Sequence, residues 1–389
     1  MDTLELPLTR AERDIPGLRG IGPATERKPQ AATREWPAGT RIISADSHWM
    51  EDDLWIDRFP EHLKDRAPRM HFKDGGWELL VEGKPMLPPE AARATCLSNE
   101  CYPGIRDVAH RMKDLDIEGV EKELLFPQRL FGIYMIYDLD IREHIYRAYN
   151  EYMATVCEQA PDRLYFAAVP NYWDPSKARQ SIEEIKKLPG ARGLMIPINP
   201  RLDNDGNPIQ YAGPAMDAFW AAAEESGLPV IFHVGEKPPT GGPGEAGTFV
   251  LVQQQGFRGS WGTLTFGGVF DRHPNLKVVF VEGGISWVAS ALHDADMIYN
   301  SFVMDPKLEM MPSEYWFRNC YAVFMTDPPG LELLHRIGVD RVMWSSDYPH
   351  PESSFGYTRT SIEQVFASTT VENAQKILGK TALDLFNMH

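Results

Sequence analysis

The stretch RIISADSHWMED, residues 41–52, decides how the rest of the chain is interpreted. Residues 41–45 predict a short buried strand, because two β-branched isoleucines are followed by the small residues serine and alanine. Residues two apart on an extended backbone point to the same side, so Asp46 and His48 can face one point in space. A carboxylate and an imidazole placed this way suit a cation. Taken alone, the motif is equally compatible with a capping role for Asp46 and an ordinary polar role for His48.

The composition predicts a soluble globular protein. A chain of 389 residues with 43% hydrophobic and 24% charged residues can bury one large core or two modest ones. The formal net charge of −16 argues against a nucleic-acid partner or an anionic membrane partner. The chain has neither an apolar run of membrane-spanning length nor a signal-peptide pattern, so we expect a cytoplasmic protein.

The four cysteines agree with a reducing compartment. Cys96 and Cys101 lie in a loop-like region and could pair or bind a metal. Two unrelated thiols are the better interpretation, because no second pair of cysteines completes a zinc set.

Strand and helix patterns alternate along the chain. Eight mostly apolar segments are predicted strands: 41–45, 122–128, 164–170, 193–199, 229–235, 277–284, 320–326 and 341–347. Helices are predicted at 138–159, 175–188, 214–226, 248–271, 285–299, 328–337, 358–367 and 371–386. Strands buried on both faces and separated by helices indicate a parallel sheet, and eight such units predict a (β/α)8 TIM barrel.

An open doubly wound sheet is the alternative fold, but it would need a glycine-rich phosphate loop after the first strand. This chain has Asp46, Ser47 and His48 there, and no Walker loop or dinucleotide fingerprint elsewhere. We therefore expect neither NAD nor a nucleotide as cofactor.

The predicted organisation is one barrel domain over residues 40–389, preceded by an irregular N-terminal arm over 1–39. Residues 50–115 are too polar and broken for barrel core, so we interpret them as an insertion near the site. The long glycine-rich stretch GEKPPTGGPGEAG, residues 235–247, is a candidate mobile lid.

Polar residues occur where several predicted strands end. His48 follows the first strand, His233 and Glu282 belong to the fifth and sixth, and Asp347 ends the eighth with His350 just beyond. The carboxyl ends of barrel strands meet on one face, where active sites are built. Imidazoles and carboxylates together suit zinc, manganese or iron, so the sequence predicts a metal site there.

These motifs resemble those of a known family. ADSH (45–48), HVG (233–235), HPNLKVVFVEGG (273–284) and SSDYPH (345–350) are together similar to the amidohydrolase-related barrel enzymes. The resemblance is closest to the branch that includes aminocarboxymuconate-semialdehyde decarboxylase and the hydroxybenzoate decarboxylases, and covers about residues 40–388. It implies that Asp46, His48, His233 and Asp347 are ligands of one metal, and that Asp347 polarises or protonates the substrate.

The chain departs from that pattern at Glu282, where many of these decarboxylases carry a histidine. A carboxylate brings negative charge and donates no hydrogen bond unless protonated, so Glu282 is a candidate general base or a bridging metal ligand. Glu51, Glu282 and His350 together offer ligands for a second cation, although surface roles for Glu51 and His350 are equally compatible with the sequence. The predicted catalytic residues are Glu282, Asp347 and His350.

A few enzymes that resemble this branch are dinuclear non-heme oxygenases. The favoured hypothesis is therefore an Fe/Fe or Mn/Fe monooxygenase that hydroxylates a small organic substrate and depends on an electron-donor protein. The first alternative is a mononuclear zinc or manganese decarboxylase or hydrolase of a carboxylate substrate. The second is a non-catalytic metal-bearing subunit of a paralogous enzyme. A homo-oligomer or a complex with a paralogous chain is expected in each case.

Three residues are predicted substrate contacts: Trp49, Arg192 and Trp261. Phe266 is a further aromatic candidate in the same region. Arg192 could pair with a substrate carboxylate in a bidentate manner, with a surface salt bridge as the alternative. Aromatic residues at such positions are core filler more often than substrate contacts.

Overall fold

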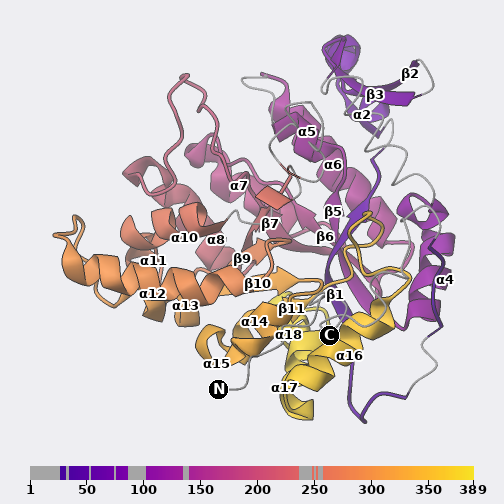
Figure 1. The fold of residues 1–389 in the computed structure, drawn as a ribbon. Coiled ribbons are helices and arrows are strands. Elements are labelled where there is room, and N and C mark those ends of the chain that lie inside the picture. The colour runs from indigo at the N-terminus through magenta and orange to yellow at the C-terminus, as the bar shows by residue number, and fades with distance from the viewer. Residues whose placement is uncertain are drawn as a thin grey trace, which may run out of the picture.

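A barrel of eight parallel strands forms the centre of the molecule (Figure 1). The computed structural model describes residues 27–31, 35–51, 54–73, 76–85, 102–134, 140–235, 248, 251–252 and 257–389. The strands are β1 (Ile43–Trp49), β5 (Lys122–Pro127), β6 (Leu164–Ala168), β7 (Ala191–Met195), β8 (Val230–His233), β9 (Val278–Val281), β10 (Cys320–Phe324) and β11 (Val342–Trp344). They lie side by side in chain order, which is the arrangement that a (β/α)8 barrel requires.

Helices follow the strands and surround the barrel. They are α4 (Val108–Glu118), α5 (Leu130–Tyr134), α6 (Arg142–Cys157), α7 (Pro175–Ile185), α8 (Asp217–Ser226), α10 (Phe257–Phe266), α11 (Val269–Arg272), α12 (Ser286–Ser301), α13 (Pro312–Asn319), α14 (Pro328–Glu332), α15 (Leu334–Ile337), α16 (Thr358–Ser368), α17 (Val371–Gln375) and α18 (Thr381–Leu385). Short 3₁₀ turns lie at Glu61–Arg66, Pro103–Ile105, Pro214–Met216 and Val339–Arg341, and a π-helical turn at Lys376–Lys380 joins α17 to α18. None of the described helices has the length and apolar character needed to cross a membrane.

The predicted fold is confirmed, with differences in where elements end. β1 continues to Trp49, so Asp46 and His48 lie within the strand and not after it. The helix predicted at 328–337 is divided into α14 and α15, and α13 was not predicted. The helix predicted at 248–271 is also divided, because Gly268 at the start of α11 has a left-handed backbone, with φ of 67°. Glycine adopts that conformation without steric cost, so it ends one helix and starts the next.

The segment predicted as an insertion, residues 50–115, contains structure of its own. It holds α2 (Leu54–Arg58) and a small antiparallel sheet of β2 (Arg69–Lys73), β3 (Gly76–Val81) and β4 (Lys84–Pro85), and this group projects from one corner of the barrel in Figure 1. Cys96 and Cys101, the candidate lid apart from Gly235, and residues 1–26 and 32–34 of the predicted arm lie outside the described residues. In the described part of the arm, Arg27 donates a hydrogen bond to the carbonyl oxygen of Ser353 over 3.0 Å.

The barrel closes where its first and last strands meet. The amide of Asp347 donates to the carbonyl of Asp46 over 2.9 Å, and the amide of His48 donates to the carbonyl of Tyr348 over 2.7 Å. We call this pair of contacts the closing seam. The C-terminal elements, yellow in Figure 1, therefore lie beside the indigo strand β1.

Candidate metal centre

The first two polar side chains of the site, Asp46 and His48, belong to strand β1. Asp46 and His48 are fully buried and lie two residues apart, so the strand pleat points both the same way. His48 Nδ1 donates to the carbonyl oxygen of Pro127 over 2.9 Å, because that oxygen can only accept. His48 Nε2 is thereby left facing the site, 3.6 Å from Asp46 Oδ1. A histidine fixed in this tautomer is ready to bind a metal through Nε2.

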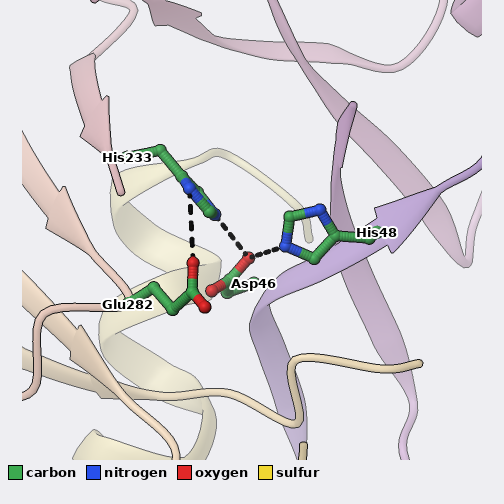
Figure 2. Close-up of side chains that lie close together, drawn as sticks. All are labelled: Asp46, His48, His233 and Glu282. Atoms are coloured by element: carbon green, nitrogen blue, oxygen red, sulfur yellow. Dashed lines mark hydrogen bonds and ion pairs between the residues drawn. The ribbon is translucent and has the colours of Figure 1, made fainter. Parts of the chain in front are cut away.

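His233 and Glu282 come from the neighbouring strands β8 and β9. His233 Nδ1 donates to the carbonyl oxygen of Val234 over 2.7 Å, and His233 Nε2 lies 3.2 Å from Asp46 Oδ1. Glu282 follows β9, and its Oε2 lies 3.5 Å from His233 Nδ1. Figure 2 shows the side chains of Asp46, His48, His233 and Glu282 pointing toward one another, with the Asp46 carboxylate between the two imidazoles.

Asp347 and His350 complete the group from the segment after β11. Asp347 Oδ1 lies 3.2 Å from His48 Nε2 and 3.1 Å from His350 Nδ1. The His350 ring stacks on the His48 ring with centroids 3.8 Å apart, and its Nδ1 lies 3.8 Å from Glu282 Oε1. The four predicted ligands, together with Glu282 and His350, therefore converge at one place.

Several buried atoms of this cluster lack a hydrogen-bond partner. Among the described residues these include both oxygens of Asp347, Oδ2 of Asp46, Nε2 of His48 and Nδ1 of His350. A buried polar atom without a partner is costly, and several at one place are satisfied together by a cation. Nitrogen and oxygen donors in this proportion suit zinc, manganese or iron. The residues therefore fit a divalent metal.

Burial and crowding shift the protonation equilibria of the cluster. Burial raises the pKa of Asp347 to about 7, and burial together with the negative charge of Asp347 raises the pKa of Glu282 to about 8. Burial and the positive charge of His350 hold the pKa of His48 well below its usual range. His48 is therefore neutral at pH 7, as a metal ligand must be.

Glu51 lies outside this cluster, contrary to the prediction that it is a metal ligand. Its carboxylate accepts the amides of Gln128, Arg129 and Leu130 over 2.7, 2.8 and 3.2 Å. Both oxygens are thus occupied by backbone donors at the start of α5. Glu51 ties the end of β1 to the β5–α5 connection and contributes to the site only by supporting it.

The three predicted substrate contacts have other neighbours in the structure. Arg192 is at the start of β7, the end of the barrel opposite the site, where it donates to the carbonyl oxygen of Asn387 over 3.1 Å. Trp49 is buried and donates to the hydroxyl of Tyr152, on α6, over 3.0 Å. Trp261 is buried in α10 as part of the hydrophobic core, and Phe266 packs against that core. Among the described residues, no hydrogen bond or ring contact links Trp49 or Trp261 to the metal cluster, and a substrate contact by either stays a prediction.

Three neighbours of the cluster were not predicted. Gln128 Oε1 lies 2.7 Å from His350 Nε2, and the Phe131 ring stacks on His233 with centroids 4.7 Å apart. A carboxylate oxygen of Glu352 lies within 4.8 Å of ligand atoms of the cluster. Gln128 had a signal in the sequence, because it follows the second strand just as Asp347 follows the eighth. Phe131 lies on the short helix α5, which was not predicted, and Glu352 lies in the segment after β11, whose course the sequence pattern does not show.

The Amidohydrolase family model matches residues 111–388 of this chain. The chain belongs to the amidohydrolase family. A gamma-resorcylate decarboxylase from Rhodococcus jostii is 27% identical over 265 residues, which cover 63% of this chain and 77% of that protein. A 2-amino-3-carboxymuconate-6-semialdehyde decarboxylase from Dictyostelium discoideum is 32% identical over 134 residues, covering 32% of this chain and 35% of that protein. The predicted resemblance is confirmed.

Solved structures share the barrel fold. An amidohydrolase from Mycobacterium avium subsp. paratuberculosis K-10 superimposes with a TM-score of 0.71 at 20% identity, covering 90% of this chain and 100% of that one. A 5-carboxyvanillate decarboxylase from Novosphingobium aromaticivorans, solved with manganese and 4-hydroxy-3-methoxy-5-nitrobenzoic acid, gives a TM-score of 0.64 at 17% identity, covering 92% and 99%.

The relatives correct the favoured hypothesis about function. The sequence led us to expect a dinuclear iron or manganese/iron monooxygenase, yet the related proteins are decarboxylases. That expectation is wrong. The electron-donor protein was expected only for an oxygenase, so the reason for expecting it no longer holds. Glu282 and His350 lie in the cluster, as the hypothesis required, but Glu51 does not. Reaction class does not follow from the presence of carboxylates around a metal site.

Proposed function

We propose that this protein is a mononuclear metal-dependent decarboxylase that removes a carboxyl group from a small hydroxylated benzoate. The metal is manganese or zinc, held by Asp46, His48, His233 and Asp347. The observation that carries the proposal is Asp347, which is fully buried at the centre of the cluster with no hydrogen bond to either oxygen. The relatives named for decarboxylation support the reaction class, and the manganese-bound solved structure supports the metal.

A bound divalent metal would supply positive charge that holds the substrate's oxygen atoms and stabilises negative charge developing on them. His48 and His233 orient the site, because a backbone carbonyl fixes each ring and directs Nε2 inward. Phe131 covers His233 on one side with an apolar surface. An apolar wall of this kind suits an aromatic ring and excludes water.

Asp347 acts as the proton donor. Its carboxyl group transfers a proton to the ring carbon that carries the carboxylate, the carbon–carbon bond breaks, and the electron pair returns to the ring as CO₂ leaves. The reaction thus replaces a carboxylate by hydrogen and consumes one proton. His350, whose Nδ1 lies 3.1 Å from Asp347 Oδ1, is placed to return that proton from solvent. Gln128 holds the far nitrogen of the His350 ring.

The direct test measures CO₂ release and loss of substrate absorbance with 2,6-dihydroxybenzoate and 5-carboxyvanillate. Metal-free protein is compared with protein reconstituted with one equivalent of Mn²⁺ or Zn²⁺. We expect decarboxylation of at least one hydroxylated benzoate only in the metal-loaded protein. Metal-loaded protein that binds these acids and leaves them unchanged would contradict the proposal.

A further inference from the structure

A fully buried ion pair lies beside the closing seam. Arg111, on α4, and Glu123, on β5, have no exposed surface, and Nε of Arg111 lies 2.7 Å from Oε2 of Glu123. The same guanidinium donates through Nη1 to the carbonyl oxygen of His48 over 2.7 Å, and Nη2 lies 3.5 Å from the carbonyl oxygen of Tyr348. It also sits 4.6 Å from the centroid of the Tyr348 ring.

The other oxygen of Glu123 connects to a cluster of serine hydroxyls in the seam. Ser47 Oγ donates to Glu123 Oε1 over 2.8 Å. The hydroxyl oxygens of Ser44, Ser47 and Ser346 lie 3.0–3.2 Å from one another. Ser44 Oγ also accepts the amide of Ser346 over 2.8 Å. One chain of hydrogen bonds therefore runs from Arg111 through Glu123 into both strands of the seam.

The seam carries metal ligands on each side. His48 and Asp46 belong to β1, and Asp347 lies between Ser346 and Tyr348 in the segment after β11. Arg111 contacts the residues on both sides at the point where the His48 amide bonds to the Tyr348 carbonyl. A shift of β1 or of the segment after β11 changes the distance between His48 and Asp347, and the guanidinium contacts both.

A buried ion pair is weak evidence for stability alone, because well-packed apolar residues often replace one at no cost. The contacts with backbone carbonyls of β1 and of the segment after β11, both of which carry metal ligands, indicate a different purpose. We propose that Arg111 and Glu123 are positioning residues that hold the closing seam at the spacing metal binding requires. This inference rests on the metal site of the proposed function, and it is independent of the reaction carried out there.

The test is the affinity for Mn²⁺ of an Arg111→Lys variant, measured by the electron paramagnetic resonance signal of free Mn²⁺ during titration. Lysine keeps a positive charge opposite Glu123 but lacks the planar fork that reaches two carbonyl oxygens and a carboxylate together. We expect the Kd for Mn²⁺ to rise about 10- to 100-fold, as is usual when residues that orient metal ligands are changed. Circular dichroism establishes that the variant is folded.

The chain offers a matched control in Arg41 and Glu121. This pair joins the segments immediately before β1 and β5, the same two strands, at the opposite end of the barrel, with Nε of Arg41 2.9 Å from Oε2 of Glu121. Both side chains are about two-fifths exposed, at 39% and 40%. Arg41→Lys preserves the charge in the same way and leaves the Kd for Mn²⁺ unchanged, because no metal ligand depends on it.

A second variant, Glu123→Gln, tests the same inference if Arg111→Lys does not fold. Glutamine retains one oxygen, which serves either Arg111 or Ser47 but not both, so the Kd for Mn²⁺ rises in the same direction. Folded variants that bind Mn²⁺ as tightly as the natural protein would overturn the inference and leave the proposed function standing. Weakened binding by the variants, with no decarboxylation by the natural protein, would support the inference while overturning the reaction. A natural protein that binds neither Mn²⁺ nor Zn²⁺ would overturn both.

Discussion

Glu282 and Asp347 each have a backbone conformation that residues with a side chain seldom adopt. Their φ angles are 68° and 56°, in the left-handed region. Such a conformation costs on the order of 1–3 kcal/mol and persists only where the surroundings impose it. Two glycines follow Glu282, and a Cβ on Gly283 would lie 2.4 Å from the Phe257 ring. The surroundings of Asp347 are the closing seam itself. Local strain thus occurs at two carboxylates of the cluster.

Replacing Asp347 by asparagine preserves the shape of the side chain and removes the proton that we assign to it. We expect kcat at saturating Mn²⁺ to fall about 100- to 10,000-fold, the usual contribution of a positioned acid. The measurement is CO₂ release under steady-state conditions. Glu118→Gln is the control, because this buried carboxylate accepts the amides of Gln30 and Gly356 outside the metal cluster. An Asp347→Asn variant with full kcat would refute the assigned role.

Glu51 gives a prediction about pH and stability. Burial raises the pKa of Glu51 from its ordinary value of 4.5 to about 7 in the folded protein, although four backbone amides, its own among them, oppose the shift. Because the folded state holds the proton more tightly, the free energy of unfolding falls as the pH rises from about 4.5 to about 7, by up to about 3 kcal/mol.

Glu51→Gln cannot ionise, so it lacks this part of the pH dependence. We expect the natural protein to lose stability relative to the variant between pH 5 and pH 8. Urea denaturation of both proteins at the two pH values measures the difference in their free energies of unfolding. Groups that titrate in the same way in both proteins do not contribute to this difference. Parallel pH profiles would show that Glu51 does not ionise in this range in the folded protein.

At the scale of elements, one carboxylate ties together two neighbouring strand–helix connections. Asp327 Oδ2 accepts the amides of Ile285 and Ser286 over 2.6 and 2.7 Å, at the start of α12, and Oδ1 accepts the amide of Gly330 over 2.9 Å, in α14. The connection that it holds begins at Glu282. Asp327 therefore stabilises the turn that presents Glu282 to the site.

Asp327→Asn replaces one acceptor oxygen by an amide group that faces backbone donors. We expect the free energy of unfolding to fall by about 1–3 kcal/mol, because at least one buried amide loses its partner. Asp174→Asn is a matched control, since Asp174 also caps a helix that begins with proline and is partly exposed. Its Oδ1 accepts the amide of Ser176 in α7, whereas its Oδ2 accepts from the side chain of Asn204 and from no second helix among the described residues. Urea denaturation compares the two variants, and equal losses would contradict the special position of Asp327.

At the scale of the whole molecule, the site forms where the barrel closes. The eight strands follow chain order, so the first and last are the pair that must meet, and the cluster takes ligands from both. A metal bound there joins the two ends of the sheet. Metal binding and the stability of the whole barrel are therefore coupled.

We expect a chelator to lower the melting temperature and Mn²⁺ to restore it. A ligand that binds only the folded state adds about 2.7 kcal/mol when its free concentration is 100 times Kd. Differential scanning calorimetry of metal-free and Mn²⁺-loaded protein measures the change. Asp46→Asn, which replaces a negatively charged ligand between the two imidazoles by a neutral amide, is expected to respond far less. A natural protein with the same melting temperature in both conditions would show that Mn²⁺ does not bind at the cluster.

The barrel fold and several residues of the site can be predicted from local sequence pattern. Continuous apolar strands alternating with helices predict the barrel, because that periodicity is set by neighbours along the chain. The same pattern places His48, His233, Glu282 and Asp347 at strand ends, which a barrel brings together. It could not show that the Glu51 carboxylate accepts amides of a later turn. The position of Arg192 was within its reach, because Arg192 precedes the predicted strand 193–199 and so lies at the end opposite the site.

The sequence by itself determined the eight-strand architecture, the family and the ligand-bearing motifs, since each depends on residue type and short-range spacing. Only the tertiary structure decided which polar groups find partners. Arg111 and Glu123 read in the sequence as an ordinary helix residue and an ordinary strand residue, yet they meet in the core beside the closing seam. Burial and pairing depend on contacts between residues far apart in the chain, and these contacts cannot be read from the local sequence pattern.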